Sequence, residues 1–450
     1  MAPARFGTDG VRGVANEELT AELALALGRA AARVLPSPAF VVGRDTRRSG
    51  PLLQAAFSAG LATEGADAID LGVIPTPGVA AVAERRKVPG AVVSASHNPF
   101  GDNGIKLFSL VGTKLPIDVE ADVERELDSI LGDPERPPRR PTGHGVGRII
   151  ADPEAPGIYR ELLVSTLEGR SLDGMHIVVD CANGAASAFA PQVLSELGAR
   201  VTALHDTPDG TNINDHCGST DPAQLSRVVV DQKAQLGLAL DGDADRAIAV
   251  DHTGTVVDGD VLLGLFALDL DSRGRLSGNT VVVTVMTNLG FRLAMEARGI
   301  GVRETDVGDR HVLAALDSDG LALGGEQSGH IIFRSQSTTG DGILTGIALA
   351  DLLQRSGRPL VDLADGLVEH VPQVLVNVPI PRPERLADCA EVWEAVAKAE
   401  AELGHEGRVL LRPSGTEPLV RVMVEARQAP QANAVAAQLA GIVEAALGTV

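Results

Sequence analysis

Ala91-Val92-Val93 leads directly into Ser94-Ala95-Ser96-His97-Asn98-Pro99. The apolar run is typical of a buried strand, and the polar residues after it are typical of the loop where that strand ends. Open α/β sheets bind their ligands at such strand ends. Ser96 beside His97 suits a covalent nucleophile, because an imidazole can accept the proton that makes serine unreactive. The same residues also suit a plain turn, in which Pro99 keeps Asn98 out of a helix.

The order of elements around this stretch occurs three times along the chain. In the first copy, a strand followed by a loop is expected at 40–46 and strands at 68–74 and 91–93, with helices between them. The third strand of the second copy is expected at 236–240, and that of the third copy at 321–324. Each of these strands runs into a polar loop. Alternating strands and helices predict α/β domains whose mostly parallel sheets are covered on both faces, and three equivalent loops indicate one shared cleft.

The composition and the order of expected elements change at two places along the chain. A Pro- and Arg-rich stretch at 133–141 is typical of a linker. From about Val371, a strand (374–380), a helix (386–403), a strand pair around 412–418 and a closing helix predict a smaller α+β domain. A chain of 450 residues is too long for one core and suits three or four domains.

The composition limits the function classes. The 60 acidic and 39 basic residues give a formal charge of −21, which argues against sequence-independent nucleic-acid binding. Cys181, Cys217 and Cys389 lie far apart without C-x-x-C spacing, which argues against a disulfide framework or a structural zinc site. The apolar runs are too short to span a bilayer, and the N-terminal residues lack a signal-peptide core. We expect a cytoplasmic protein with no nucleic-acid or membrane partner, whose oligomeric state stays open, a homodimer included.

Asp241-Gly-Asp-Ala-Asp-Arg246 follows the third strand of the second copy. In an extended loop, carboxylates at alternate positions share one face. Three hard oxygen ligands of this kind suit Mg²⁺. The alternative is an acidic surface turn, in which Arg246 would offset part of the repulsion between the carboxylates.

Two further loops offer groups that could bind a substrate. Gly325-Glu-Gln-Ser-Gly-His330 carries side chains that can hydrogen-bond several sugar hydroxyls. Arg412-Pro-Ser-Gly-Thr-Glu-Pro418 carries consecutive backbone N–H groups, two hydroxyls and a guanidinium, with Arg421 as a second cation, and so suits an anion. A glycine-flanked turn and a tight hairpin are the plain alternatives. Lys106 and Arg12 are further candidate cations, although Lys106 also suits an exposed surface position.

A nucleophilic hydroxyl, an Mg²⁺ site, a set of sugar-binding groups and an anion nest together predict phosphoryl transfer on a sugar phosphate. These loops, in this order, resemble the α-D-phosphohexomutase superfamily over essentially the whole chain, and most of all its bacterial phosphoglucosamine mutases. The stretches that carry the resemblance are 5–13, 180–185, 212–215, 217–220 and 308–310, together with Gln327.

The resemblance implies a fold and a division of the chain. It implies three related α/β domains with mixed, mostly parallel sheets and a C-terminal α+β domain, all around one central cleft. The expected domains are 1–152, 153–251, 252–370 and 371–450. Two departures from the family pattern are Ala244, where a glycine is usual, and Pro413, where a lysine is common.

The resemblance also implies a role for each loop. Ser96 would carry the phosphate as phosphoserine, and one Mg²⁺ would be bound by that phosphoserine with Asp241, Asp243 and Asp245. Glu326 and Ser328 would hold sugar hydroxyls. The substrate's other phosphate would be held by Arg412, Ser414, Gly415, Thr416 and Arg421. The groups near the reacting phosphate, or suited to proton transfer, would be Arg12, His97, Lys106, Arg246 and His330.

The activity implied by the resemblance is the interconversion of glucosamine 6-phosphate and glucosamine 1-phosphate, towards UDP-N-acetylglucosamine and cell-wall precursors. Its intermediate would be a 1,6-bisphosphate, and glucosamine or glucose 1,6-bisphosphate would act as activator. The alternative within this class is phosphoglucomutase or phosphomannomutase activity. A serine phosphatase and a non-enzymatic sugar-phosphate sensor are alternatives from other classes.

Overall fold

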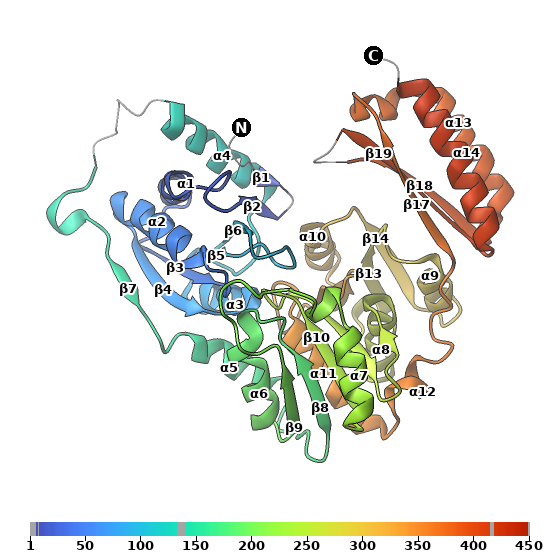
Figure 1. The fold of residues 1–450 in the computed structure, drawn as a ribbon, viewed down its shortest axis with the longest axis horizontal. Coiled ribbons are helices and arrows are strands. Elements are labelled where there is room, and N and C mark those ends of the chain that lie inside the picture. Colours follow the sequence, from blue (N-terminus) through green and yellow to red (C-terminus); the bar gives the residue numbers. More distant parts are fainter. Residues whose placement is uncertain (1–5, 8, 133–139, 415–417, 449–450) are drawn as a thin grey trace. The chain divides into compact units, whose positions relative to one another are not determined.

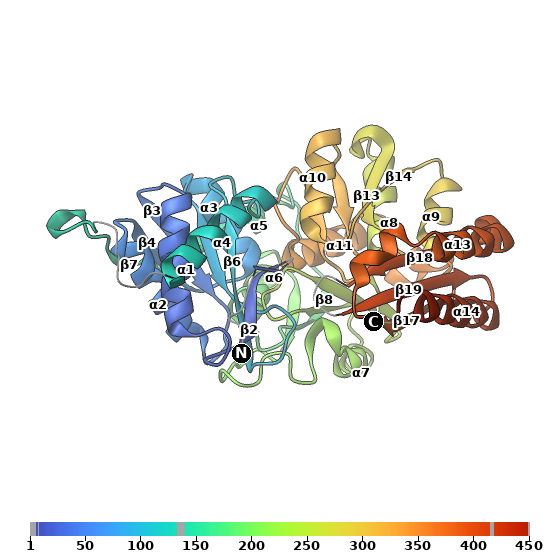
Figure 2. The same ribbon diagram turned by 90° about the horizontal axis from the view of Figure 1, so that it is seen from above.

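The structure is a computed structural model that describes residues 6–7, 9–132, 140–414 and 418–448. The chain divides into two compact units (Figures 1 and 2). Unit 1 comprises residues 1–285 and 303–365, and unit 2 comprises residues 286–302 and 366–450. Each unit is described by itself. In the described part of the chain, no helix is both long and apolar enough to cross a membrane.

The first sheet of unit 1 has seven strands in the order β1-β2-β6-β5-β3-β4-β7. Its central strands β5, β3 and β4 are parallel, and β6 pairs antiparallel with β5. The strand bounds are β1 Phe6–Gly7, β2 Gly10–Val14, β3 Ala39–Arg44, β4 Asp67–Val73, β5 Gly90–Val93, β6 Asp102–Phe108 and β7 Ile149–Ala151.

Helices cover this sheet, and two of them, α1 and α2, pack closely together through glycines. A Cβ on Gly28 would lie 2.2 Å from the carbonyl oxygen of Phe57, and a Cβ on Gly60 would lie 2.2 Å from that of Leu25. Only glycine therefore allows α1 and α2 to approach this closely. The helix bounds in this part of the chain are α1 Ala21–Val34, α2 Gly50–Thr63, α3 Thr76–Arg86, α4 Ile117–Gly132 and α5 Pro156–Ser165.

The second and third sheets repeat the arrangement of the first. Their orders are β12-β11-β10-β8-β9 and β14-β13-β15-β16. The strand bounds are β8 His176–Asp180, β9 Arg200–Leu204, β10 Leu236–Leu240, β11 Ala247–Asp251, β12 Val256–Val257, β13 Thr280–Thr284, β14 Gly301–Thr305, β15 Leu323–Gly325 and β16 Ile331–Phe333. The helix bounds are α6 Ala190–Glu196, α7 Ala223–Asp231, α8 Gly259–Ser272, α10 Asp309–Asp319, α11 Gly342–Ser356 and α12 Leu360–Ala364.

One connection recurs in all three sheets and positions the polar loops. In each sheet a parallel strand is followed by an antiparallel neighbour: β5 by β6, β10 by β11, and β15 by β16. The three polar loops at 94–99, 241–246 and 326–330 occupy these three connections. The expectation of α/β domains with mixed sheets is thus confirmed, and the equivalent position of the loops has a common cause in the repeated strand pairing.

Unit 2 contains a three-stranded antiparallel sheet in the order β17-β19-β18. Helices α13 and α14 lie side by side on one face of this sheet (Figures 1 and 2) and share its apolar core. The bounds are β17 Gln373–Pro379, β18 Gly407–Pro413, β19 Leu419–Ala426, α9 Leu289–Glu296, α13 Ala390–Leu403 and α14 Ala429–Leu447. This is the predicted α+β arrangement. The helix expected at 386–403 is a 3₁₀ turn at Pro383–Asp388 followed by α13.

Candidate active site

The backbone around Ser96 is a buried left-handed turn between β5 and β6. Ser96 has a φ of 51° and is fully buried. Its N–H donates to Ser94 Oγ at 3.0 Å, and the Ser94 hydroxyl donates to Asp45 Oδ2 at 2.7 Å. Ser94 is therefore a residue of the turn, as its sequence position indicates, and it holds the Ser96 backbone in place.

The buried side chain of Arg47 stabilises this turn through hydrogen bonds to its backbone. The guanidinium donates to the carbonyl oxygens of Ser96 at 2.9 Å and Asn98 at 2.7 Å, and also to those of Pro99 and Asp102. Its Nε donates to Asp45 Oδ2 at 2.8 Å, with both side chains fully buried. A planar guanidinium can satisfy several acceptors at fixed angles, which a flexible ammonium cannot.

The Ser96 hydroxyl points at the acidic loop. It donates to Asp241 Oδ2 at 2.6 Å, and its oxygen lies 3.3 Å from His97 Nδ1. The Arg246 guanidinium lies 3.3 Å from the same imidazole nitrogen. Burial lowers the pKa of His97, and the positive charges of Arg246 and Arg12 lower it further. The neutral imidazole is thus favoured beside the hydroxyl.

Asp241, Asp243 and Asp245 converge in the connection between β10 and β11. All three are buried, and one carboxylate oxygen from each lies within 4.8 Å of the others. Thr76 Oγ1 donates to Asp243 Oδ2 at 2.7 Å. In the described part of the chain, Oδ1 of Asp243 and Oδ1 of Asp245 are buried without a hydrogen-bond partner. Three converging carboxylates with unsatisfied oxygens fit a hard divalent cation such as Mg²⁺.

Lys106 lies within this carboxylate cluster instead of on the surface. Its Nζ is 2.9 Å from Asp243 Oδ2, 3.1 Å from Asp9 Oδ2 and 3.5 Å from Asp245 Oδ2. Burial opposes the charge of Lys106, but Asp243, Asp9 and Asp245 outweigh it and raise the pKa of the amine. Burial and the two neighbouring carboxylates raise the pKa of Asp241 well above its usual range.

The loop between β15 and β16 lies near the same cluster. Glu326 Oε1 accepts a hydrogen bond from Gly308 N–H at 3.2 Å, and Ser328 Oγ donates to Glu326 Oε2 at 3.4 Å. Gly340 N–H donates to His330 Nε2 at 2.9 Å, so the proton of the neutral ring lies on Nδ1. That nitrogen is 3.7 Å from Asp245 Oδ1, which connects this loop to the acidic one.

Unit 1 therefore brings together most of the side chains singled out in the sequence. They are Ser96, His97, Lys106, Arg12, Asp241, Asp243, Asp245, Arg246, Glu326, Ser328 and His330. Sequence reasoning missed other groups of the site. Asp9 and Asp309 both pair with Lys114, the latter at 2.8 Å, and Asn214 Nδ2 donates to the Ser96 carbonyl oxygen at 2.8 Å. Asp9, Asp309 and Asn214 lie inside the stretches that carry the family resemblance, whereas no local pattern marks Lys114.

Two cationic residues of the predicted anion nest are cross-strand neighbours in unit 2. Arg412 on β18 is directly opposite Arg421 on β19, and Ser414 follows the end of β18. Burial and the charge of Arg421 lower the pKa of Arg412. Two adjacent cations of this kind attract an anion. Gly415 and Thr416 lie outside the described residues.

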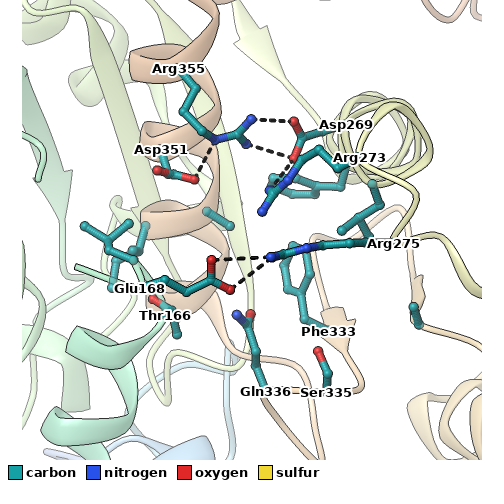
Figure 3. A pocket seen from close by; sticks show the side chains of 16 residues that line it. Thr166, Glu168, Asp269, Arg273, Arg275, Phe333, Ser335, Gln336, Asp351 and Arg355 are labelled. Carbon is teal, nitrogen blue, oxygen red and sulfur yellow. Dashed lines mark hydrogen bonds and ion pairs between the residues drawn. The ribbon is translucent and has the colours of Figure 1, made fainter. Parts of the chain in front are cut away.

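A cavity of about 110 Å³ lies elsewhere in unit 1 (Figure 3). Its walls carry paired charges: Arg355 bonds Asp269 at 2.8 Å and Asp351 at 2.8 Å, and Arg275 bonds Glu168 at 3.0 Å. These groups satisfy one another, so the cavity has the character of a structural ion-pair network.

Comparison with known proteins gives one consistent result. Four models of the phosphoglucomutase/phosphomannomutase family match the chain: alpha/beta/alpha domain I at residues 3–131, domain II at 159–254, domain III at 258–371 and the C-terminal domain at 375–442. A phosphoglucosamine mutase from Kineococcus radiotolerans is 52% identical over 451 residues, which cover 97% of this chain and 98% of the relative.

Solved structures agree with this result. A phosphoglucomutase/phosphomannomutase family protein from Burkholderia thailandensis has a TM-score of 0.78 at 27% identity, covering 98% of this chain and 97% of the other. An Aspergillus fumigatus N-acetylphosphoglucosamine mutase, solved in complex with GlcNAc-6P and magnesium, shares the fold with a TM-score of 0.67 at 18% identity, covering 99% and 96% of the two chains. The chain belongs to the phosphoglucosamine mutase family, within the phosphoglucomutase/phosphomannomutase proteins, and is an enzyme of the isomerase type.

Proposed function

We propose that this enzyme interconverts glucosamine 6-phosphate and glucosamine 1-phosphate, with Ser96 as its phosphate carrier. The observation that carries the proposal is the buried Ser96 hydroxyl, held 2.6 Å from Asp241 beside two further carboxylates. A hydroxyl next to a cation site is suited to receive and return a phosphoryl group. The name of the Kineococcus radiotolerans relative supports glucosamine phosphate as the substrate.

The reaction conserves the phosphoryl group. The bond between phosphorus and Ser96 Oγ breaks, and a bond from phosphorus to the free hydroxyl of the sugar phosphate forms. The proton of that hydroxyl leaves, and Ser96 Oγ ends protonated. The 1,6-bisphosphate then turns end for end, and its other phosphoryl group returns to Ser96 by the reverse step. Glucosamine or glucose 1,6-bisphosphate added from outside would enter at this intermediate and phosphorylate an empty Ser96.

The residues around Ser96 would share the remaining work. Asp241, Asp243 and Asp245 would hold Mg²⁺ with an oxygen of the phosphoserine, and the ion would neutralise charge on the transferring group. Arg12 and Arg246 would bind phosphoryl oxygens, and His97, Lys106 and His330 are the groups suited to proton transfer. Sugar hydroxyls would be held by Glu326 and Ser328, and the other phosphate by Arg412, Ser414, Gly415, Thr416 and Arg421.

The decisive experiment is a mutase assay on Ser96→Ala with catalytic 1,6-bisphosphate. We expect turnover to be abolished and intact-mass measurement to lose the added phosphate, while the melting temperature is retained. Ser195→Ala is the matched control, because Ser195 is exposed and its hydroxyl donates only to Pro191 of its own helix among the described residues. Near-normal turnover by Ser96→Ala would refute the role of Ser96.

Substrate preference separates this proposal from its alternative. Phosphoglucomutase or phosphomannomutase activity would give a higher kcat/KM on glucose or mannose phosphates than on glucosamine phosphate. Release of free phosphate at the rate of turnover would instead indicate a phosphatase. A cytoplasmic location and a homodimer stay predictions, to be checked by fractionation and by sedimentation.

A further inference from the structure

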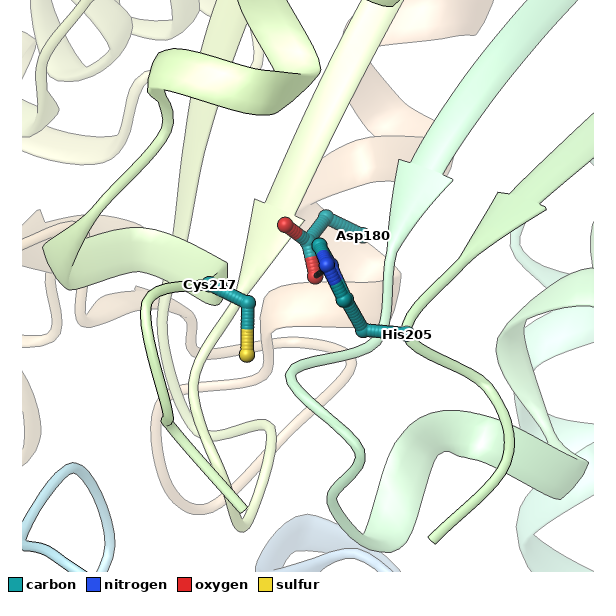
Figure 4. A group of neighbouring side chains, drawn as sticks. All are labelled: Asp180, His205 and Cys217. Atoms are coloured by element: carbon teal, nitrogen blue, oxygen red, sulfur yellow. Dashed lines mark ion pairs between the residues drawn. The ribbon is translucent and has the colours of Figure 1, made fainter. Parts of the chain in front are cut away.

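A second group of metal-ligating side chains lies in unit 1 apart from the three aspartates. Asp180, His205 and Cys217 come from three separate segments and lie close together (Figure 4). Asp180 ends β8, His205 directly follows β9, and Cys217 directly precedes the 3₁₀ turn Gly218–Thr220. One potential ligand atom from each lies within 4.8 Å of the other two.

Hydrogen bonds fix the carboxylate but leave it able to bind further. Asp180 Oδ1 accepts from Ala182 N–H at 2.9 Å, and Oδ2 accepts from Gly218 N–H at 3.0 Å. Each carboxylate oxygen has two lone pairs, so one lone pair on each remains available. The Asp180 carboxylate is thus oriented in advance, which lowers the cost of adding a ligand.

The imidazole of this group lies against the Asp180 carboxylate. His205 Nδ1 is buried and lies 3.0 Å from Asp180 Oδ1, but within the described residues it is not aligned for a hydrogen bond with any acceptor. The His205 side chain as a whole is 20% exposed, which gives the group an opening to solvent.

The surroundings of the thiol are negative. Cys217 is fully buried, and the carboxylates of Asp180, Asp215 and Asp221 act on it electrostatically. A divalent cation would compensate these charges and make the thiolate the favoured form.

We propose that Asp180, His205 and Cys217 bind a Zn²⁺ ion, with water in the fourth position. A sulfur, a nitrogen and an oxygen ligand suit a borderline-soft cation with tetrahedral geometry, whereas the all-oxygen set of Asp241, Asp243 and Asp245 suits Mg²⁺. Binding converts the Cys217 thiol to a thiolate bound to the metal and releases one proton to solvent. The two sites are thus distinguished by the softness of their ligands.

The position of this site gives it a structural consequence. The ion would join the ends of β8 and β9 to the segment 206–217. Asn214 of that segment donates to the carbonyl oxygens of Ser96 at 2.8 Å and Asn98 at 3.0 Å. Zn²⁺ would therefore stiffen a segment that supports the Ser96 turn, without touching the substrate.

The test uses Co²⁺ as a spectroscopic substitute for Zn²⁺. The full-length enzyme is stripped with a chelator, saturated with Mg²⁺ to occupy the three aspartates, and titrated with Co²⁺. We expect one equivalent to give the near-ultraviolet thiolate-to-cobalt absorption and the visible bands of a tetrahedral site, both abolished by Zn²⁺. No thiolate-to-cobalt absorption in this titration would overturn the proposal.

Variants locate the ligands. Cys217→Ser should remove the thiolate absorption, and His205→Ala, at a partly exposed position that should tolerate the change, should weaken cobalt binding at least about tenfold. Two control variants should retain the absorption: Cys389→Ser, in unit 2, and Asp243→Asn, in the group of three aspartates. Retention by Cys217→Ser, or loss in Cys389→Ser, would refute the assignment. If Cys217→Ser does not fold by circular dichroism, the His205→Ala titration decides alone.

Discussion

Arg47 holds the Ser96 turn although it lies outside that turn in the sequence. Its donors satisfy four backbone carbonyl oxygens and the buried carboxylate of Asp45. The proposed transfer of a phosphoryl group to and from Ser96 needs such a fixed backbone, because a displacement of about 1 Å can cost about 10²-fold in rate. Arg47 is thus a positioning residue for Ser96.

The substitution Arg47→Lys keeps the charge but loses the planar fork. We expect kcat to fall by about 10²-fold while the KM for the sugar phosphate changes little, because the turn shifts and the substrate-binding loops do not. Steady-state kinetics and a melting curve check this. Arg48→Lys is the matched control, since Arg48 is the exposed neighbour. Equal losses in both variants, or a change confined to KM, would contradict the positioning role.

Ala244 in the acidic loop carries backbone strain. It is fully buried, with a φ of 57°, in the left-handed region that favours glycine. A non-glycine residue costs about 1 kcal/mol or more in this conformation. We therefore expect Ala244→Gly to raise the free energy of unfolding by about 1 kcal/mol, as measured by denaturant unfolding. A clear loss of stability would show that packing of the buried methyl group outweighs the strain.

At the scale of elements, helix α11 begins at a buried aspartate whose protonation depends on its surroundings. Asp341 Oδ1 accepts from Leu344 N–H at 2.9 Å and from the Tyr159 hydroxyl at 2.9 Å. Burial raises the pKa of Asp341 to about 7. The native state therefore keeps a proton on this residue that the unfolded chain releases near pH 4.

This raised pKa makes stability pH dependent in a defined direction. Between about pH 4 and 7 the native state binds more protons than the unfolded state, so this group makes stability fall with rising pH, by about 1.4 kcal/mol per pH unit. Asp341→Asn should remove that slope in denaturant unfolding across this range. Tyr159→Phe removes a hydrogen bond that favours the charged carboxylate, so its slope should extend to higher pH. An unchanged pH profile in Asp341→Asn would refute the assignment.

At the scale of the whole molecule, unit 2 has an apolar core and stabilising contacts of its own. In unit 2, the buried Glu425 bonds Arg408 at 2.7 Å and accepts from Leu289 N–H at 3.2 Å. Because each unit encloses its own apolar cluster, we expect calorimetry to resolve two unfolding transitions.

Glu425→Ala should move only one of these transitions. Removing one partner of a buried ion pair costs about 3–5 kcal/mol, and that loss is confined to unit 2. Glu406→Ala is the control within the same unit, because its pair with Arg427 is exposed and contributes about 1 kcal/mol or less. A parallel shift of both transitions in Glu425→Ala would show that the units unfold together. The division into four domains stays a prediction at this scale.

The repeated pattern of strands, helices and polar loops was readable along the chain because it is local. Hydrophobic runs such as 91–93 and 236–240 mark buried strands, and the polar residues after them mark the loops. The antiparallel partners β6, β11 and β16 were not predicted, because strand pairing depends on contacts between distant segments.

The family, the α/β class and the polar composition of the loops can be read along the chain, because residue types and their spacing carry that information. Which groups surround Ser96 depends on how the chain folds. Lys106 lies buried among Asp9, Asp243 and Asp245. Arg47 donates to the carbonyl oxygen of Ser96, from which it is separated by 49 positions in the sequence. Folding likewise brings Asp180, His205 and Cys217 together. The physical reason is that a side chain's charge state and partners depend on burial and on neighbours that folding brings together, and no local spacing encodes either.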